Sequence, residues 1–224
     1  MADLRLGGKF AGEEPVTQSA AVELIPARPS IPSLRTAAQE CRACELWQKG
    51  TQTVFGEGAR TAEIMLVGEQ PGDQEDRKGR PFVGPAGRLL DEALVAAGIE
   101  RRRAYLTNVV KHFNWAPKGK RRIHRKPNLE HIAACRPWLD AELSVVRPRA
   151  LVCLGATAAQ AVIGRDFRVM KQRGQILDSE LAPILMATVH PSSILRLRDE
   201  DRAEGMRLFV ADLNGLATAL TQSE

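Results

Sequence analysis

The stretch AEIMLVGEQPGDQED, residues 62–76, decides the fold, because a mostly apolar run leads directly into a polar, glycine-containing loop. Three further apolar runs follow, at residues 105–110 (YLTNVV), 150–154 (ALVCL) and 184–189 (ILMATV). Helical patterns alternate with these runs at residues 86–97, 129–146, 157–163 and 199–220, and Pro137 is expected to perturb the second helix. Continuous apolar strands that alternate with helices are typical of a parallel sheet covered on both faces. We therefore predict an α/β fold, a three-layer α/β/α sandwich with a central four-stranded parallel sheet.

Unusual polar segments follow all four predicted strands. The first strand leads to GEQPG, the second ends near Asn108, the third leads to GATAA and the fourth to HPSS. Ligands of open parallel sheets bind at the carboxyl ends of the strands, so these segments are expected to meet at one site. The first loop is neither G-x-G-x-x-G nor a GK[ST] phosphate loop, which weakens the alternative of a mononucleotide-binding enzyme.

The positive charge of the chain is concentrated in one segment. The 224 residues carry a formal net charge of +5, yet residues 101–129 contain ten Lys or Arg and no Asp or Glu. This segment contributes +10, so the remainder sums to −5. A local basic patch favours a phosphate-bearing partner, most plausibly nucleic acid, and a solvated loop is the alternative.

Other features of the sequence indicate which classes of protein can be excluded. An apolar content of 44% is enough for a packed core. No apolar run approaches the ~18 residues of a membrane-spanning helix, and the N-terminus lacks a signal peptide's apolar centre, so we expect a cytoplasmic protein. Residues 1–32 contain four prolines and are predicted to be a flexible or loosely packed leader before a domain at 33–224. Ser33 is the predicted N-cap of a helix over residues 34–49.

Four cysteines suggest a metal site. Cys41 and Cys44 form a C-x2-C pair on or at the end of the first helix, Cys135 lies in a predicted helix and Cys153 in the third strand. A disulfide framework is not expected in a cytoplasmic chain, and zinc sites usually use two C-x2-C pairs. One pair with two single cysteines suits an iron–sulfur cluster at least as well. The alternative for Cys153 is a buried apolar residue.

These motifs together resemble a known family. GEQPGDQED (68–76), GRPFVGPAG (79–87), the cysteines, GATAA (155–159) and HPSS (190–193) resemble the iron–sulfur uracil-DNA glycosylases of family 4 over about residues 36–214. Gln70, where those enzymes usually have a small residue, and KRRIH at Lys120–His124 resemble the UdgX branch. Members of that branch remove uracil and then stay covalently attached to the DNA.

The resemblance implies a fold, a cofactor and a substrate. It implies a uracil-DNA glycosylase-like domain with a [4Fe–4S] cluster bound by Cys41, Cys44, Cys135 and Cys153, and zinc is the less favoured alternative. The implied substrate is uracil-containing DNA, preferably single-stranded, acted on in DNA repair by a monomeric bacterial protein that is nucleoid-associated when bound. A conventional multiple-turnover family 4 glycosylase and a non-catalytic iron–sulfur DNA-binding module are the two alternatives.

Uracil must leave the base stack before its glycosidic bond can be reached. Phe82 is the expected stacking platform, although it could equally be a core residue. Asn108 can donate to and accept from the uracil edge. Gln70 is also expected to bind uracil, and the backbone amides of residues 70–72 could bind a uracil carbonyl. His190 resembles the histidine that donates towards uracil O2.

The remaining site residues are expected to act on the sugar and the phosphates. Asp73 is the candidate to position water or the sugar, and Asp76 is expected to fix its loop. Ser192 and Ser193 suit a phosphate or serve as N-caps. The expected DNA contacts are the cations of the basic segment that precede or surround KRRIH: Lys111, Lys120, Arg121, Arg122, Arg125 and Lys126.

His124 carries the sharpest expectation. The UdgX resemblance implies that its imidazole attacks the sugar C1′ after uracil departs and leaves a stable bond to DNA. Only the neutral ring has a free lone pair. Glu69 is the candidate to orient His124 or to take its proton, and Gln70 is expected to shape the same pocket.

Overall fold

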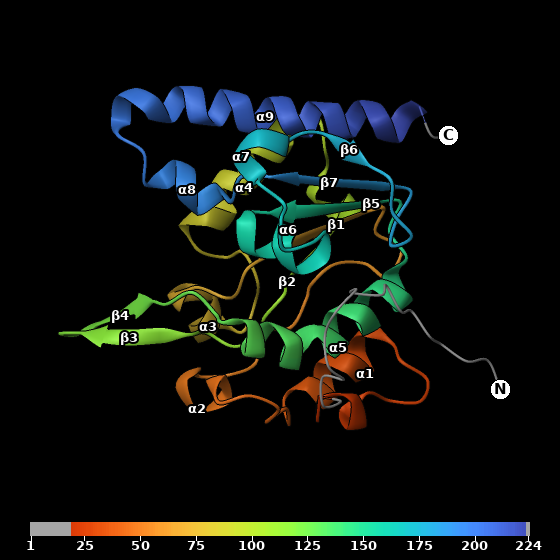
Figure 1. Cartoon of the computed structure of the whole chain (residues 1–224), viewed down its shortest axis with the longest axis vertical. Helices are drawn as coiled ribbons and strands as arrows, with labels where there is room; N and C mark the ends of the chain where they lie inside the picture. Colours follow the sequence, from red (N-terminus) through yellow and green to blue (C-terminus); the bar gives the residue numbers. More distant parts are fainter. Residues whose placement is uncertain (1–18, 223–224) are drawn as a thin grey trace.

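A five-stranded sheet with the order β2-β1-β5-β7-β6 forms the middle layer of the structure, a computed structural model that describes residues 19–222 (Figure 1). Its four parallel strands are β1 (Ile64–Gly68), β2 (Ala104–Asn108), β5 (Ala150–Leu154) and β7 (Ile184–Thr188), and all of their residues are buried. This confirms the predicted parallel centre. The two-residue edge strand β6 (Ile176–Leu177), antiparallel to β7, was not predicted.

Helices cover both faces of the sheet, as Figure 1 shows. One face packs against α1 (Ile31–Ala38), α5 (Leu129–Val146) and α6 (Ala156–Val162), and the other against α4 (Pro85–Ala96), α8 (Pro191–Leu195) and α9 (Asp199–Gln222). Successive strand residues alternate between the two cores: Met65 and Val67 face the first, Ile64 and Leu66 the second. Burial on both faces explains why the strands read as continuous apolar runs.

The predicted helices α4, α5, α6 and α9 begin and end within two residues of the predicted bounds. Pro137 lies inside α5 and the helix continues through it, so the expected perturbation does not end the helix. No described helix combines the length and apolar character that crossing a bilayer requires.

The N-terminal part differs from the prediction. Ser30, not Ser33, is the N-cap of α1, and the two side chains form a capping box. The predicted continuous helix is two helices, α1 and α2 (Leu46–Lys49), because the chain between them leaves the helix and buries Cys41 beside α5. Residues 1–18 of the predicted leader lie outside the described residues. Packing begins before residue 33, since Ala21, ahead of the 3-10 helix η1 (Val22–Leu24), is fully buried.

The segment predicted as a basic loop is an antiparallel hairpin. Strands β3 (Trp115–Lys118) and β4 (Arg121–His124) pair Trp115 with His124, and Gly119 supplies the positive φ of 59° that the tight turn requires. The hairpin projects from the side of the molecule beside the short helix α3 (Asp73–Lys78), below the sheet in Figure 1. A chain of mostly polar residues carries little period-2 signal, which explains why no strand was predicted here.

Candidate active site

A cavity of about 730 Å³ lies at the carboxyl ends of the parallel strands. Residues at or just after the end of each of the four strands line it, where the polar segments were expected to meet. The residues named from sequence that line this strand-end cavity are Glu69, Gln70, Phe82, Asn108, His124, Lys126, His190, Ser192 and Ser193.

Phe82 and Asn108 form one wall of the cavity. Both are almost fully buried, with 7% and 3% of their surface exposed. A Cβ on Gly68, the last residue of β1, would lie 2.4 Å from Asn108 Oδ1 and 2.8 Å from Phe82 Cζ, so glycine permits this close approach. Phe82 has a φ of 54°, an uncommon value for a non-glycine residue, in a turn that leaves its ring facing the cavity. A planar apolar ring therefore lies beside a carboxamide in the lining of the cavity.

His190 faces the same wall. It is the N-cap of α8, and its Nδ1 accepts the Ser192 backbone N–H at 3.1 Å. This assigns the ring proton to Nε2, which makes Nε2 a hydrogen-bond donor. Burial lowers the pKa of His190 to about 4, so the ring is neutral at neutral pH. The His190 and Phe82 rings are stacked, with centroids 6.2 Å apart and an interplanar angle of 29°.

The two serines of HPSS are in hydrogen-bond contact with His190. Ser193 Oγ donates to the His190 carbonyl at 2.7 Å, and Ser192 Oγ lies 2.8 Å from Nδ1. Gly155, after β5, has a φ of 90°, and a Cβ there would lie 2.9 Å from His190 Cβ. The segment after β7 therefore holds the imidazole in one orientation.

His124 and Glu69 are in contact with each other in the lining of the cavity. His124 Nε2 lies 3.1 Å from Glu69 Oε1, and Thr157 Oγ1 donates to Oε2 of the same carboxylate. Burial alone would raise the pKa of Glu69, but the hydrogen bonds from His124 and Thr157 outweigh it and lower that pKa. Glu69 is therefore an anion at neutral pH, positioned to accept a proton from the imidazole.

Gln70 anchors the hairpin that carries His124. Its Nε2 donates to the carbonyls of Asn114 and Arg125 at 3.2 and 3.1 Å, and its Oε1 accepts the Asn114 N–H at 3.2 Å. These are the residues immediately before β3 and after β4. The predicted contact of the Gln70 carboxamide with uracil is corrected accordingly, because the amide is already engaged by the backbone at both hairpin ends.

Arg122 and Asp73 are paired with each other. Arg122 Nε donates to Asp73 Oδ1 at 2.5 Å and Nη1 to Asp76 Oδ2 at 2.6 Å, while its guanidinium lies 5.4 Å from the Phe113 ring centroid. Burial raises the pKa of Asp73, but Arg77 and Arg122 hold it below its usual value. Arg122 is thus engaged with α3, and Asp73 lies outside the cavity lining; the phosphate contact of Arg122 and the role of Asp73 towards water or the sugar stay predictions. Asp76 is fully buried and fixes its loop, as expected.

Lys111 is not a DNA contact. Its side chain is 1% exposed, and Nζ donates to Glu142 Oε2 at 2.6 Å, Thr107 Oγ1 at 2.6 Å and the Asn108 carbonyl at 2.7 Å. Glu142 is fully buried and also accepts from Tyr105 Oη at 2.9 Å. This network is closed to solvent and fixes the end of β2, where Asn108 lies.

The predicted +10 segment is therefore not one patch. Arg101–Arg103, in the 3-10 helix η2, precede β2 at the opposite end of the sheet and pair with Asp91, Glu100 and Glu63. The cations that remain exposed around the hairpin are Lys118, Lys120, Arg121, Arg125 and Lys126. Of these, Lys126 lines the cavity.

Several residues that line the cavity were not predicted from the sequence. Val169 and Met170, on the four-residue helix α7 (Val169–Gln172), line the cavity, as does Arg196 at the end of α8. Glu75 lines it too and accepts the Gly84 N–H at 2.7 Å, which ties α3 to the turn of Phe82. A helix this short carries no usable periodicity, so the sequence offered no signal for α7.

The four cysteines are free thiols. Cys41, Cys135 and Cys153 are buried and Cys44 is partly exposed. Two N–H groups point at sulfur: Trp138 Nε1 donates to Cys41 Sγ and the Lys111 backbone N–H donates to Cys135 Sγ, both at 3.3 Å. Within residues 19–222, no three His, Cys, Asp or Glu side chains are grouped closely enough to hold a single metal ion. The cysteine side chains are thus mostly buried, and the sulfurs of Cys41 and Cys135 accept N–H groups.

Comparison with known proteins identifies relatives. The model of the uracil DNA glycosylase superfamily matches residues 55–214. A type-4 uracil-DNA glycosylase of Thermotoga maritima is 40% identical over 73% of this chain and 82% of its own length. One of Sulfurisphaera tokodaii is 37% identical over 74% of this chain and 76% of its own. The solved structure of Pedobacter heparinus SMUG2 aligns with a TM-score of 0.48 and 12% identity, over 72% of this chain and 77% of that one.

Proposed function

Because the chain belongs to the uracil-DNA glycosylase superfamily and is similar to its type-4 members, we propose that it excises uracil from DNA by cleaving the N-glycosidic bond. One observation carries the proposal: Phe82, Asn108 and the neutral His190 ring line one cavity at the strand ends. The site therefore combines a stacking surface, a carboxamide and a fixed N–H donor.

These three groups suit the chemistry of glycosidic cleavage. A uracil turned out of the base stack would lie against Phe82, with its edge bonded to Asn108. As the C1′–N1 bond breaks, the bonding electrons move onto uracil, and the Nε2–H of His190 would stabilise the charge that develops on the base. A donor that is already oriented by Ser192 loses little freedom in doing so.

Release of labelled uracil from a single-stranded oligonucleotide tests this proposal. His190→Ala is expected to lower the single-turnover rate about 10²- to 10³-fold, as loss of one donor to a developing anion does. Val95→Ala, an exposed residue of α4 away from the cavity, is the control and should match the wild type. A wild-type protein that binds the oligonucleotide but leaves every glycosidic bond intact would instead be a binding module.

The His124–Glu69 contact favours a second candidate function, retention of the product as an adduct. In this reaction the C1′–N1 bond breaks with its electrons going to uracil, His124 Nε2 bonds to C1′, and Glu69 takes the Nε2 proton. Uracil leaves as an anion and takes up one proton, equivalent to the one that Glu69 has accepted and then releases, so the proton count balances. Turnover, in which water attacks C1′ instead, agrees better with the type-4 relatives.

A denaturing gel separates the two outcomes. The adduct predicts a band of protein plus DNA that survives boiling in detergent and is absent for His124→Ser, while that variant still releases some uracil. Turnover predicts free abasic DNA in excess of the protein and no such band.

The four cysteines are proposed to hold a [4Fe–4S] cluster. Buried thiols with N–H donors to sulfur, as at Cys41 and Cys135, are what iron–sulfur clusters use, and a cluster accepts wider sulfur spacing than one zinc ion. Bound there, the cluster would supply a structural crosslink between the Cys41–Cys44 loop, α5 and β5. Iron and sulfide analysis with the visible absorption spectrum tests this, and a colourless protein with one zinc would contradict it.

A further inference from the structure

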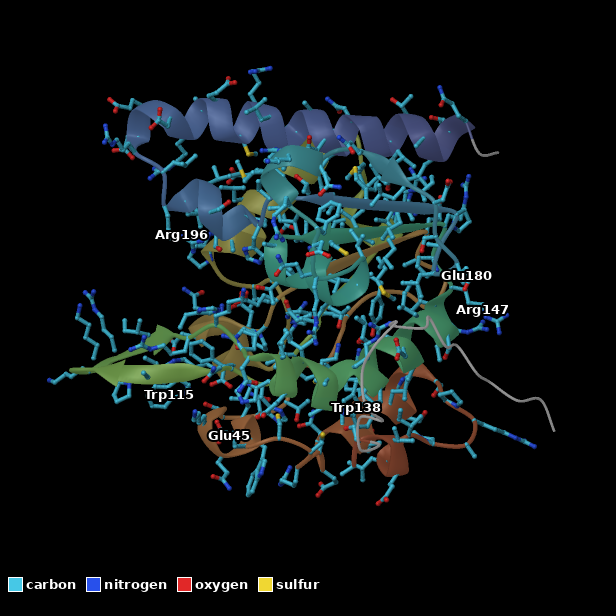
Figure 2. All side chains as sticks on the ribbon, viewed as in Figure 1. Glu45, Trp115, Trp138, Arg147, Glu180 and Arg196 are labelled. Atoms are coloured by element: carbon cyan, nitrogen blue, oxygen red, sulfur yellow. The ribbon has the colours of Figure 1, made fainter. Side chains whose placement is uncertain are left out.

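Two further cations lie on elements other than the β3–β4 hairpin, in or next to the segments that line the strand-end cavity. Arg196 lines the cavity, and Lys171 is exposed on α7 next to the lining residue Met170. Figure 2 shows Arg196 beside α8, above the hairpin that carries Trp115. The hairpin side contributes Lys126, which also lines the cavity. Positive charge therefore borders the cavity from more than one element.

Met170 stands out among the exposed apolar side chains. It is 72% exposed, yet it borders the cavity together with Val169. Single exposed apolar residues are common and need no function, and Val95, 78% exposed on α4, is one of them. Met170 differs because it lines the proposed site: it precedes the exposed Lys171 in the chain, and Arg196 lines the same cavity.

The size of the cavity leaves room for more than uracil. Its volume of about 730 Å³ lies in the range of pockets that hold drug-sized ligands, ~300–1,000 Å³. A pyrimidine stacked on Phe82 would leave the outer part, bordered by Met170, to the neighbouring nucleotides.

We propose that Met170 contacts the base next to the excised uracil, while Lys171 and Arg196 bind the phosphates on that side. This inference rests on the proposed uracil excision. Flexible apolar side chains such as Met are used by DNA-binding proteins to fill the gap beside a displaced base. The DNA strand would then cross the opening, with Lys126 on one side of the displaced nucleotide and Arg196 on the other.

The test uses single-stranded oligonucleotides whose neighbour to the uracil, 5′ or 3′, is either a normal nucleotide or an abasic analogue. Single-turnover excision with protein in excess gives the rate and the half-saturating concentration, whether or not the product stays attached. For the wild type, removing the base on one side is expected to raise the half-saturating concentration about fivefold. Met170→Ala should raise it similarly with the normal oligonucleotide and be insensitive to the missing base.

Lys171→Ala supplies an independent measurement. Loss of one phosphate contact is expected to reduce the slope of log affinity against log salt by about 0.7 for a single strand. Val95→Ala and Arg102→Ala, exposed residues away from the cavity, are the matched controls and should leave both measurements unchanged.

The outcomes distinguish this inference from the function on which it rests. A wild type that leaves uracil in place overturns the proposed function and the inference with it. A wild type that excises uracil, with Met170→Ala equally sensitive to the missing base, overturns the inference alone. If Lys171→Ala leaves the salt slope unchanged, Lys171 does not contact a phosphate and that part of the inference is wrong.

Discussion

The imidazole of His124 and the carboxylate of Glu69 are in hydrogen-bond contact, Nε2 to Oε1 at 3.1 Å, although they come from a hairpin and from the end of β1. Three anchors produce this contact. Gln70 bonds the backbone at both hairpin ends, Arg122 pairs β4 with α3, and Thr157 fixes the other oxygen of Glu69. The pair is therefore preorganised in the protein before any ligand arrives.

Replacing Glu69 by Gln removes the proton acceptor while keeping the shape. If the adduct forms, we expect Glu69→Gln to slow its formation at least about 10²-fold, as loss of a general base does, and to change uracil release much less. Both products are measured on the same denaturing gel and release assay. Glu130→Gln, exposed at the start of α5, is the control. Equal loss of release and adduct would show that Glu69 serves excision itself.

The sequence alone indicated the strand-end site because its signals are local. Apolar runs marked the four parallel strands, and the polar residues at or near their carboxyl ends, such as Asn108 and His190, had to meet at one edge. The pairings of Arg122 with Asp76 and of Lys111 with Glu142 join residues 46 and 31 positions apart. Such partners are chosen by the packed fold, so a cation that looks available for DNA in the sequence was engaged inside the protein.

Two histidines whose pKa values are lowered make the stability depend on pH. Burial lowers the pKa of His112 and of His190 to about 4, below the ~6.5 of an unfolded chain. The unfolded state therefore binds protons first, and stability is full above about pH 6.5 and falls as the pH drops towards 4. Between pH 7.5 and pH 5, the unfolding free energy measured with urea should fall less for His112→Gln than for the wild type. Parallel loss in both proteins would contradict the assignment to His112.

Arg122 is expected to be a structural anchor of the hairpin. Arg122→Gln leaves the fully buried Asp76 without its cation and should cost about 2 kcal/mol of unfolding free energy. It should also speed tryptic cleavage in the hairpin. Arg121→Gln changes the adjacent, exposed side chain and is expected to do neither. If Arg122→Gln altered only the salt dependence of DNA binding, the original prediction of a phosphate contact would be right.

Lys111 and Lys120 provide a matched pair of lysines with opposite expectations. Lys111 is buried against Glu142, so Lys111→Met leaves a buried carboxylate unpaired and should cost about 3–5 kcal/mol of unfolding free energy. Lys120 is exposed in the hairpin turn, so Lys120→Met should leave stability within about 0.5 kcal/mol and reduce the salt slope of DNA binding instead. Urea unfolding and binding at several salt concentrations measure both.

The double variant Lys111→Met with Glu142→Leu removes the unpaired charge and should recover part of the lost stability. Because Lys111 also holds the Asn108 carbonyl, uracil excision by the double variant should stay impaired even where stability returns. Full recovery of excision would show that Lys111 contributes to folding alone.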